Sequence, residues 1–90
     1  MSRPQFTELA WNEYMYWHNQ DKKTLKKINK LISDIMKNGA LEGEGKPERL
    51  KGDLSGYYSR RINEKDRLIY RVIDDDIVEI YSCQGHYSDK

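Results

Sequence analysis

The chain has 90 residues, of which 37% are hydrophobic, and its 16 basic and 15 acidic residues give a formal net charge of +1. So short a chain excludes a second hydrophobic core, which predicts a single domain over residues 1–90. Cys83 is the only cysteine, which excludes an internal disulfide and a thiolate metal cluster. No apolar run reaches the ~20 residues of a membrane span, and no signal-type apolar segment opens the chain. We therefore expect a soluble protein of the reducing cytoplasm, without membrane partners.

Two amphipathic helices are predicted in the N-terminal half. The first runs from Glu8 to His18 with Thr7 as its N-cap, after a short edge strand that ends at Gln5-Phe6. Its apolar residues recur at helical spacing and are predicted to face the core: Ala10, Trp11, Tyr14, Met15 and Trp17. His18 closes this helix, a position where a histidine that bonds carbonyl groups is ordinary.

The second predicted helix begins after Asp21 and ends near Lys37, before Asn38-Gly39. One of its faces is apolar. The other, which we call the lysine face, has no interspersed acid and consists of Lys22, Lys23, Lys26, Lys27 and Lys30. Like charges four residues apart cost some helix stability. The lysine face is therefore either an ordinary solvated surface or a surface that binds nucleic acid, such as RNA of the ribosome.

Four strands are predicted after a glycine-rich connection over residues 40–47. Turn residues separate them, and their ranges are Arg49–Lys51, Tyr57–Ile62, Arg67–Ile73 and Ile77–Ser82. The nearly continuous apolar pattern of the third strand predicts a central strand covered by the helices. Two helices followed by consecutive strands indicate an α+β domain, with the helices packed on a twisted antiparallel sheet.

One carboxylate and several cations fall within or just beyond these strands. The set comprises Glu48, Lys51, Arg61, Arg67, His86 and Tyr87. RNA is cut without a metal or cofactor when its own 2′-hydroxyl attacks phosphorus. A carboxylate or histidine then removes the hydroxyl proton, cations neutralise the phosphorane, and a histidine protonates the leaving 5′-oxygen. The set has a group for each task, although the same residue types are common on a solvated sheet face.

Three other groups of residues give only weak evidence for a functional site. Cys83 is near His86 in the sequence, but a cysteine in an apolar strand is typical of a buried, unreactive thiol. His18 and His86 have no spacing that predicts a metal site. Gly45-Lys46 is followed by Pro47, so the phosphate-binding loop pattern is absent.

Nearly the whole chain resembles one known family. The resemblance rests on the helical segments WNEYMYW and KKINKLI, on GKPE, LSGYYSRRI and RLIY in that order, and on the C-terminal His86-Tyr87 pair. These segments resemble the YoeB (Txe) toxins of bacterial toxin–antitoxin systems, within the RelE superfamily. The resemblance implies a RelE-like fold and a ribosome-dependent endoribonuclease that cuts mRNA in the ribosomal A site. It also implies a homodimer and a co-produced antitoxin of the YefM/Phd type.

The resemblance implies a role for each residue of the set. Glu48 would be the general base and His86 the general acid, although an exchange of these two roles stays open. Arg61 and Arg67 would stabilise the phosphorane, with support from Lys51.

The resemblance further implies that Tyr87 positions RNA. Arg60 is predicted to have no such role, because strand alternation places it on the face opposite its neighbour Arg61. The chain departs from many relatives at Gln84-Gly85, where a basic and an aromatic residue are usual, and in its extension Ser88–Lys90. Gly85 is expected to loosen this tail.

The sequence leaves open two functions other than that of a nuclease. ParE toxins, a sister group, poison gyrase and generally lack this acid–base pair. A plain RNA-binding module would need the lysine face but not Glu48. Mapping of cleaved mRNA ends would separate these functions from a nuclease.

Overall fold

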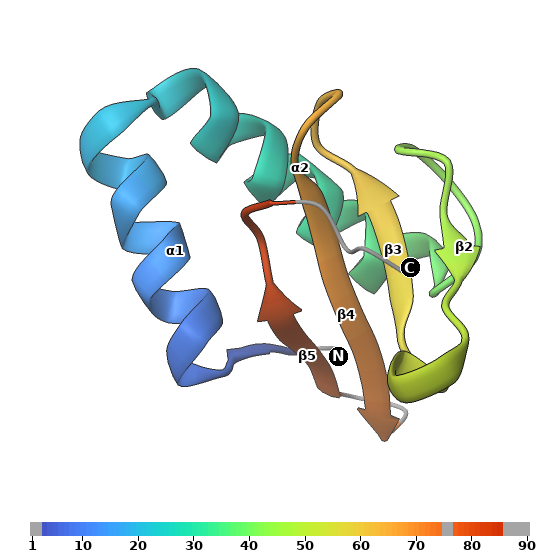
Figure 1. The fold of residues 1–90 in the computed structure, drawn as a ribbon. Coiled ribbons are helices and arrows are strands. Elements are labelled where there is room, and N and C mark those ends of the chain that lie inside the picture. The colour runs from blue at the N-terminus through green and yellow to red at the C-terminus, as the bar shows by residue number, and fades with distance from the viewer. Residues whose placement is uncertain (1–2, 75–76, 86–90) are drawn as a thin grey trace.

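Two helices cover one face of a five-stranded sheet in the computed structural model, which describes residues 3–74 and 77–85 (Figure 1). The helices are α1 (Glu8–Gln20) and α2 (Lys22–Asn38), and a short 3-10 helix, η1, spans Gly52–Leu54. The strands are β1 (Arg3–Phe6), β2 (Glu48–Arg49), β3 (Tyr58–Arg61), β4 (Arg67–Asp74) and β5 (Ile77–Ser82). The predicted α+β class is confirmed. Neither helix of the described part is long and apolar enough to span a membrane.

The sheet is antiparallel except at one edge. Its strand order is β1-β5-β4-β3-β2, and β1 pairs with β5 in parallel, from Arg3 opposite Ile77 to Phe6 opposite Ile80. The prediction of a wholly antiparallel sheet was therefore incomplete. Local patterning identified a short edge strand but contained no information on its partner, because that partner lies more than 70 residues later in the chain.

Side-chain caps set the helix boundaries much as predicted. Thr7 Oγ1 accepts a hydrogen bond from the Ala10 N–H at 3.0 Å, and the Thr7 hydroxyl donates to the Tyr81 carbonyl at 2.9 Å. The N-cap of α1 is thereby tied to β5. Asp21 separates the two helices and caps the second, since its Oδ1 accepts from the Thr24 N–H at 3.2 Å. Because Asp21 alone connects the helices, α1 runs up to Gln20, two residues beyond its predicted end at His18.

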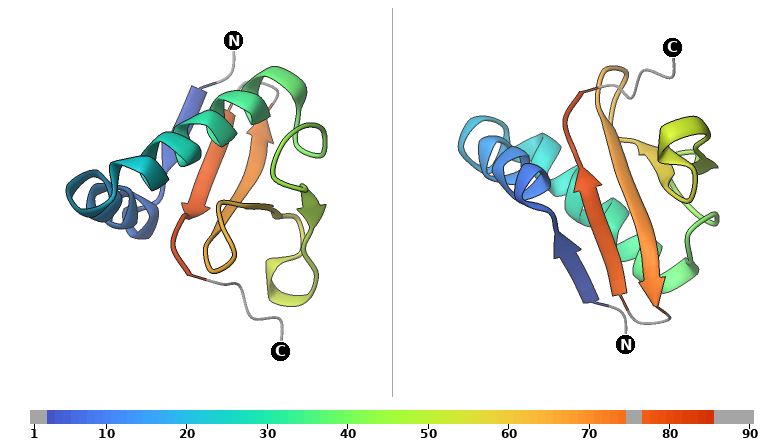
Figure 2. Two further views of the ribbon diagram at one scale, coloured as in Figure 1. Left: turned by 90° about the horizontal axis from the view of Figure 1, so that it is seen from above. Right: turned by 60° about the horizontal axis from the view of Figure 1, so that its bottom comes forward.

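The core lies between the helices and the sheet. Its buried residues come from both layers, and include Ala10, Trp17, Ile28, Leu31, Ile32, Ile35, Leu68, Tyr70, Val78 and Ile80. Figure 2 shows α2 crossing the strands on one side, while the opposite side of the sheet has no α-helix over it in the described residues. We call this opposite side the open face.

Two predictions about the core were only partly correct. Trp11 was placed in the core but is 49% exposed, and it packs on Phe6 and Tyr14 at the end of α1. Val72 and Ile73 of the predicted central strand are 41% and 44% exposed. The pairing of β3 with β4 ends at Tyr70, so the second half of β4 projects beyond the covered part of the sheet.

Candidate functional site

Two arginines of the predicted set face each other on the open face. Successive strand residues point to opposite sides of a sheet, and Leu68 and Tyr70 point toward the helices. Arg67 therefore points to the open face, and Arg61 shares that face because it is the direct cross-strand partner of Arg67. Arg61 is exposed and Arg67 is half-buried. Like charges directly opposite each other destabilise a sheet, so this pair favours a bound anion.

The short strand β2 adds a carboxylate to this face. Glu48 lies directly opposite Ser59, which is two residues from Arg61 along β3, so Glu48 and Arg61 point the same way. Diagonal neighbours of this kind have Cα atoms roughly 7–8 Å apart, within reach of long side chains. The Glu48 side chain is exposed. Lys51, also exposed, follows as the N-cap residue of η1.

The turn between β3 and β4 holds the Arg67 guanidinium. Arg67 Nη1 donates to the carbonyls of Asn63 and Asp66, at 2.7 and 3.2 Å. The turn itself is closed by Asn63 Oδ1, which accepts from the N–H groups of Lys65 and Asp66, both at 2.8 Å. Among the described residues, Arg67 Nε and Nη2 have no hydrogen-bonding partner. One edge of the guanidinium is thus fixed while the other is available to a phosphate.

The last described residue of the chain lies beside Arg67. The Gly85 N–H donates to Asp66 Oδ1 at 2.7 Å, and the Gly85 carbonyl accepts from the Arg67 N–H at 2.9 Å. Gly85 has a φ of +86°, which glycine adopts without strain. Both backbone polar groups of Gly85 are thus hydrogen-bonded, whereas the expectation of a loose tail also concerns residues 86–90, which lie outside the described residues. His86 and Tyr87 lie outside the described residues.

Comparison with known proteins identifies the family. A family model described as the YoeB-like toxin of bacterial type II toxin–antitoxin systems matches residues 6–87. The chain belongs to this YoeB-like toxin family. It is 51% identical to Toxin YoeB of Synechocystis sp. over 82 residues, which cover 91% of this chain and 93% of the relative.

Solved structures of YoeB toxins have the same fold. The chain is 52% identical to a chain of the heterotetrameric YoeB–YefM toxin–antitoxin complex from Staphylococcus aureus, with a TM-score of 0.89 over 97% of this chain and 99% of that chain. It is also 52% identical to the YoeB dimer of S. aureus, with a TM-score of 0.89 over 96% of this chain and 98% of that chain. These matches confirm the predicted family and fold, whereas the roles of the individual site residues stay predictions.

A cleft borders the lysine face of this YoeB-like chain. The cleft has a volume of about 390 Å³ and is lined by Lys23, Thr24, Lys27, Ile62 and Asn63. It lies next to the candidate site, because the Asn63 carbonyl accepts a hydrogen bond from Arg67. Two lysines and an amide, without a lining acid, form a suitable surface for a phosphate group.

The other lysines are placed differently. Lys22 and Lys26 are exposed and are not among the residues that line the cleft. Lys30 forms an ion pair with Glu44, with Nζ and Oε2 3.7 Å apart. The sequence showed no acid within the lysine face, but the loop after α2 folds back and supplies one.

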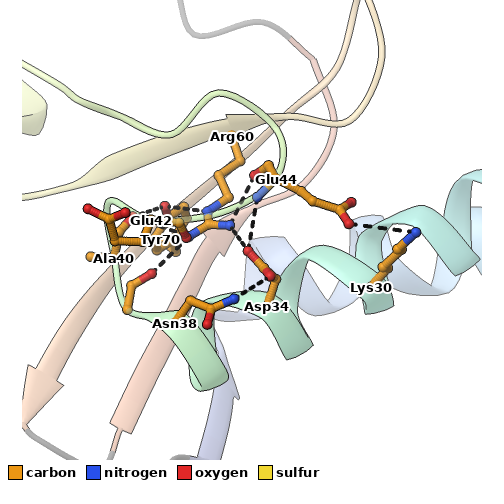
Figure 3. Close-up of polar contacts among 9 residues, drawn as sticks. Lys30, Asp34, Asn38, Ala40, Glu42, Glu44, Arg60 and Tyr70 are labelled. Atoms are coloured by element: carbon orange, nitrogen blue, oxygen red, sulfur yellow. Dashed lines mark hydrogen bonds and ion pairs between the residues drawn. The ribbon is translucent and has the colours of Figure 1, made fainter.

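Arg60 is the buried counterpart of the site arginines. It faces the helices as alternation predicted, its side chain is fully buried, and it makes six hydrogen bonds (Figure 3). Arg60 Nη1 lies 2.6 Å from Asp34 Oδ2, and Nη2 donates to the Gly39 and Glu42 carbonyls at 2.8 and 2.7 Å. These bonds fasten the loop that leads to Glu48. An arginine at a core-facing strand position is the sequence signal for such a network.

The structure describes the alternative constellations only in part, because His86 lies outside the described residues. Cys83 is fully buried, as predicted, and burial raises the pKa of its thiol to about 12. His18 is exposed at the surface of α1. Among residues 3–74 and 77–85, no group of three His, Cys, Asp or Glu side chains is arranged to hold a metal ion.

Proposed function

We propose that this chain is a ribosome-dependent endoribonuclease toxin that cuts mRNA in the ribosomal A site. The observation that supports this proposal is the cross-strand pair Arg61–Arg67 on the same open face as Glu48. Neither arginine of the pair has a carboxylate partner in the described residues, so the positive charge is available to a phosphodiester. Membership of the YoeB-like toxin family supports the choice of substrate.

The proposed reaction uses the substrate's own nucleophile. Glu48 removes the proton of the 2′-hydroxyl, and the 2′-oxygen attacks the adjacent phosphorus. Arg61 and Arg67 neutralise the charge that develops on the phosphorane. The bond to the 5′-oxygen then breaks, and His86 donates a proton to that oxygen. The products are a 2′,3′-cyclic phosphate and a 5′-hydroxyl end.

Two further residues support this reaction in the proposal. Lys51 adds positive charge near Glu48, and Tyr87 positions the RNA. The assignments of His86 and Tyr87 rest on the family resemblance alone. No metal or cofactor takes part in the proposed steps.

The proposed partners follow from the same surfaces and from the relatives. Lys23 and Lys27 would bind RNA phosphates of the ribosome, which places the protein's action in the cytoplasm. The S. aureus YoeB structures, one a complex with YefM and one a dimer, support a YefM-type antitoxin and a homodimer for this chain. Such antitoxins offer an acidic, partly disordered segment, and the open-face arginines provide a complementary surface.

One experiment tests the proposed function. Purified protein is mixed with programmed ribosomes, and the 5′ ends of the mRNA are mapped and analysed chemically. We expect A-site cuts that leave 5′-hydroxyl ends, and a loss of about 10²–10⁴-fold in rate for Glu48→Gln and for His86→Gln. Glu64→Gln removes the same charge from the exposed β3–β4 turn and serves as the matched control.

The outcome distinguishes three possibilities. Cuts with 5′-phosphate ends would contradict attack by the 2′-hydroxyl. Ribosome binding without any cut, unchanged in the Glu48→Gln, His86→Gln double variant, would favour a non-catalytic binder. Glu48 would be structural if Glu48→Gln lowered the stability of the protein while the fraction that stays folded still cut mRNA.

A further inference from the structure

The segment after β5 leaves the sheet and is held by side chains. The last cross-strand pair of β5 joins Ser82 to Ile69. Beyond it, Glu13 Oε1 accepts the Cys83 N–H at 2.8 Å, and Trp17 Nε1 donates to the Cys83 carbonyl at 2.9 Å. Asp66 Oδ1 accepts the Gly85 N–H at 2.7 Å. Two carboxylates from distant elements, α1 and the β3–β4 turn, therefore bind N–H groups of this segment, in addition to the backbone bond from the Arg67 N–H to the Gly85 carbonyl.

These two carboxylates are shielded from water, which costs free energy unless they are hydrogen-bonded. Asp66 is only 9% exposed, and Glu13 is half-buried. Burial raises the pKa of Glu13, and the charge of Asp66 raises it further, against the lowering effect of the Cys83 and Gln84 N–H groups. Two like charges in a shielded place disfavour each other. The bonds that offset this cost are made to residues 83–85, so the two acids serve that segment.

Asp66 also couples this segment to the phosphate-binding arginine. Its carboxylate binds the Gly85 N–H, while its carbonyl accepts from Arg67 Nη1. The Arg67 N–H in turn donates to the Gly85 carbonyl. The backbone that precedes His86 and the guanidinium of Arg67 are therefore parts of one hydrogen-bonded unit.

We infer that Glu13 and Asp66 are positioning residues for the general acid: together they fix the backbone of residues 83–85, from which the chain continues into His86. This inference rests on the proposed function, in which His86 protonates the 5′-oxygen. A misplacement of about 1 Å costs on the order of 10²-fold in rate. A loosened segment therefore lowers the rate of the chemical step and leaves ribosome binding unaffected.

Substitution of the two acids tests the inference. Glu13→Ala and Asp66→Ala remove the acceptor, whereas Glu13→Gln and Asp66→Asn retain one acceptor oxygen. With saturating ribosomes, below the melting temperature of every variant, we expect each Ala variant to cleave roughly 10–10²-fold more slowly in a single turnover. The Gln and Asn variants recover part of the rate, and binding to ribosomes is unchanged. Amide exchange at Cys83, Gln84 and Gly85 becomes faster in the Ala variants, and Glu64→Ala is the control.

A double-variant cycle separates positioning from general destabilisation. In the His86→Gln background, Glu13→Ala and Asp66→Ala cause a much smaller further loss of rate, because the proton donor that they position is gone. Equal losses in both backgrounds, or a wild-type rate for both Ala variants, would overturn the inference while the proposed function stands. A wild-type protein that does not cut mRNA, or a His86→Gln variant that cuts at the wild-type rate, would overturn both.

Discussion

Arg60 and Arg61 are adjacent residues of the same type, yet the fold treats them in opposite ways. Arg60 points into the protein, is fully buried and makes six hydrogen bonds, one of them to a carboxylate (Figure 3). Arg61 points to the open face, is exposed, and has no side-chain partner among the described residues. A buried charge is tolerated only when its hydrogen bonds are complete. The exposed one is available to an external ligand.

The nearby carboxylates show the same difference. Asp34 binds Arg60, the Glu44 N–H and the Asn38 amide, and the bond from Arg60 is the largest cause that holds its pKa below the usual value. Glu48 lies exposed on the open face. The helix-side network thus shapes the loop between α2 and β2, while the open face has groups not used by the fold. This contrast separates the arginine bound within the fold, Arg60, from the arginine that we propose binds phosphate, Arg61.

Exchange of each arginine for alanine is the strongest test of this contrast. Arg60→Ala leaves Asp34 and several carbonyls without their donor, so we expect it to lower the free energy of unfolding by about 3–5 kcal/mol. Arg61→Ala should change stability by no more than about 0.5 kcal/mol. It should nevertheless reduce single-turnover cleavage by roughly 10²–10³-fold, the loss typical of one group that stabilises developing charge. Denaturant unfolding and single-turnover cleavage measure the two effects.

Lysine replacements provide the control for this test. Arg60→Lys retains the charge but not the planar fork of donors, so it should remain strongly destabilising. Arg61→Lys should retain part of the activity. If Arg61→Ala destabilised the protein as much as Arg60→Ala, the division between a structural and a functional face would be wrong.

Local features of the fold were predictable from the sequence. Thr7 and Asp21 were recognised as caps, β5 has the predicted bounds, and alternation placed Arg60 and Arg61 on opposite faces. Each of these depends on residues a few positions apart. The parallel pairing of β1 with β5 and the ion pair between Lys30 and Glu44 depend on contacts between segments that the pattern of either segment does not reveal.

The same limit applies to the candidate site. Glu48, Arg61 and Arg67 were identified by residue type and by resemblance, and the strand register brings them to one face. Glu13 and Asp66 were missed, because their partners are backbone N–H groups, which every residue offers. Glu13 is 70 positions from Cys83. Composition and spacing contain no signal for such a bond.

The lysines of α2 provide a second comparison between groups that line a candidate binding surface and groups that do not. Lys23 and Lys27 line the cleft beside Asn63, whereas Lys22 and Lys26 do not. Lys23→Gln, Lys27→Gln should weaken ribosome binding more than the matched pair Lys22→Gln, Lys26→Gln, which removes the same charge from the same helix. Each lost phosphate contact lowers the slope of log K against log salt by roughly 0.7–0.9. Filter binding at several salt concentrations measures both slopes.

Two results would change this interpretation. Equal losses for the two lysine pairs would mean that α2 acts through its general charge, without a defined phosphate site in the cleft. Unchanged binding for both pairs would show the lysine face to be a solvated surface. The single-turnover rate on saturating ribosomes should stay near that of the wild type in all four substitutions.

The smallest expected effect is a difference in how the two faces respond to acid. The pKa of Asp34 is lowered from 3.8 in the folded protein, chiefly by the hydrogen bond from Arg60. Its contribution to stability is therefore present above pH 3.8 and is lost as the pH falls through the lower folded value. In urea unfolding measured at a series of pH values from above 3.8 downwards, Asp34→Asn should lose less stability on acidification than the wild type. Asp53→Asn, an exposed substitution in η1, should lose as much stability on acidification as the wild type. If Asp34→Asn lost as much stability on acidification as the wild type, the Arg60 network would not depend on this charge.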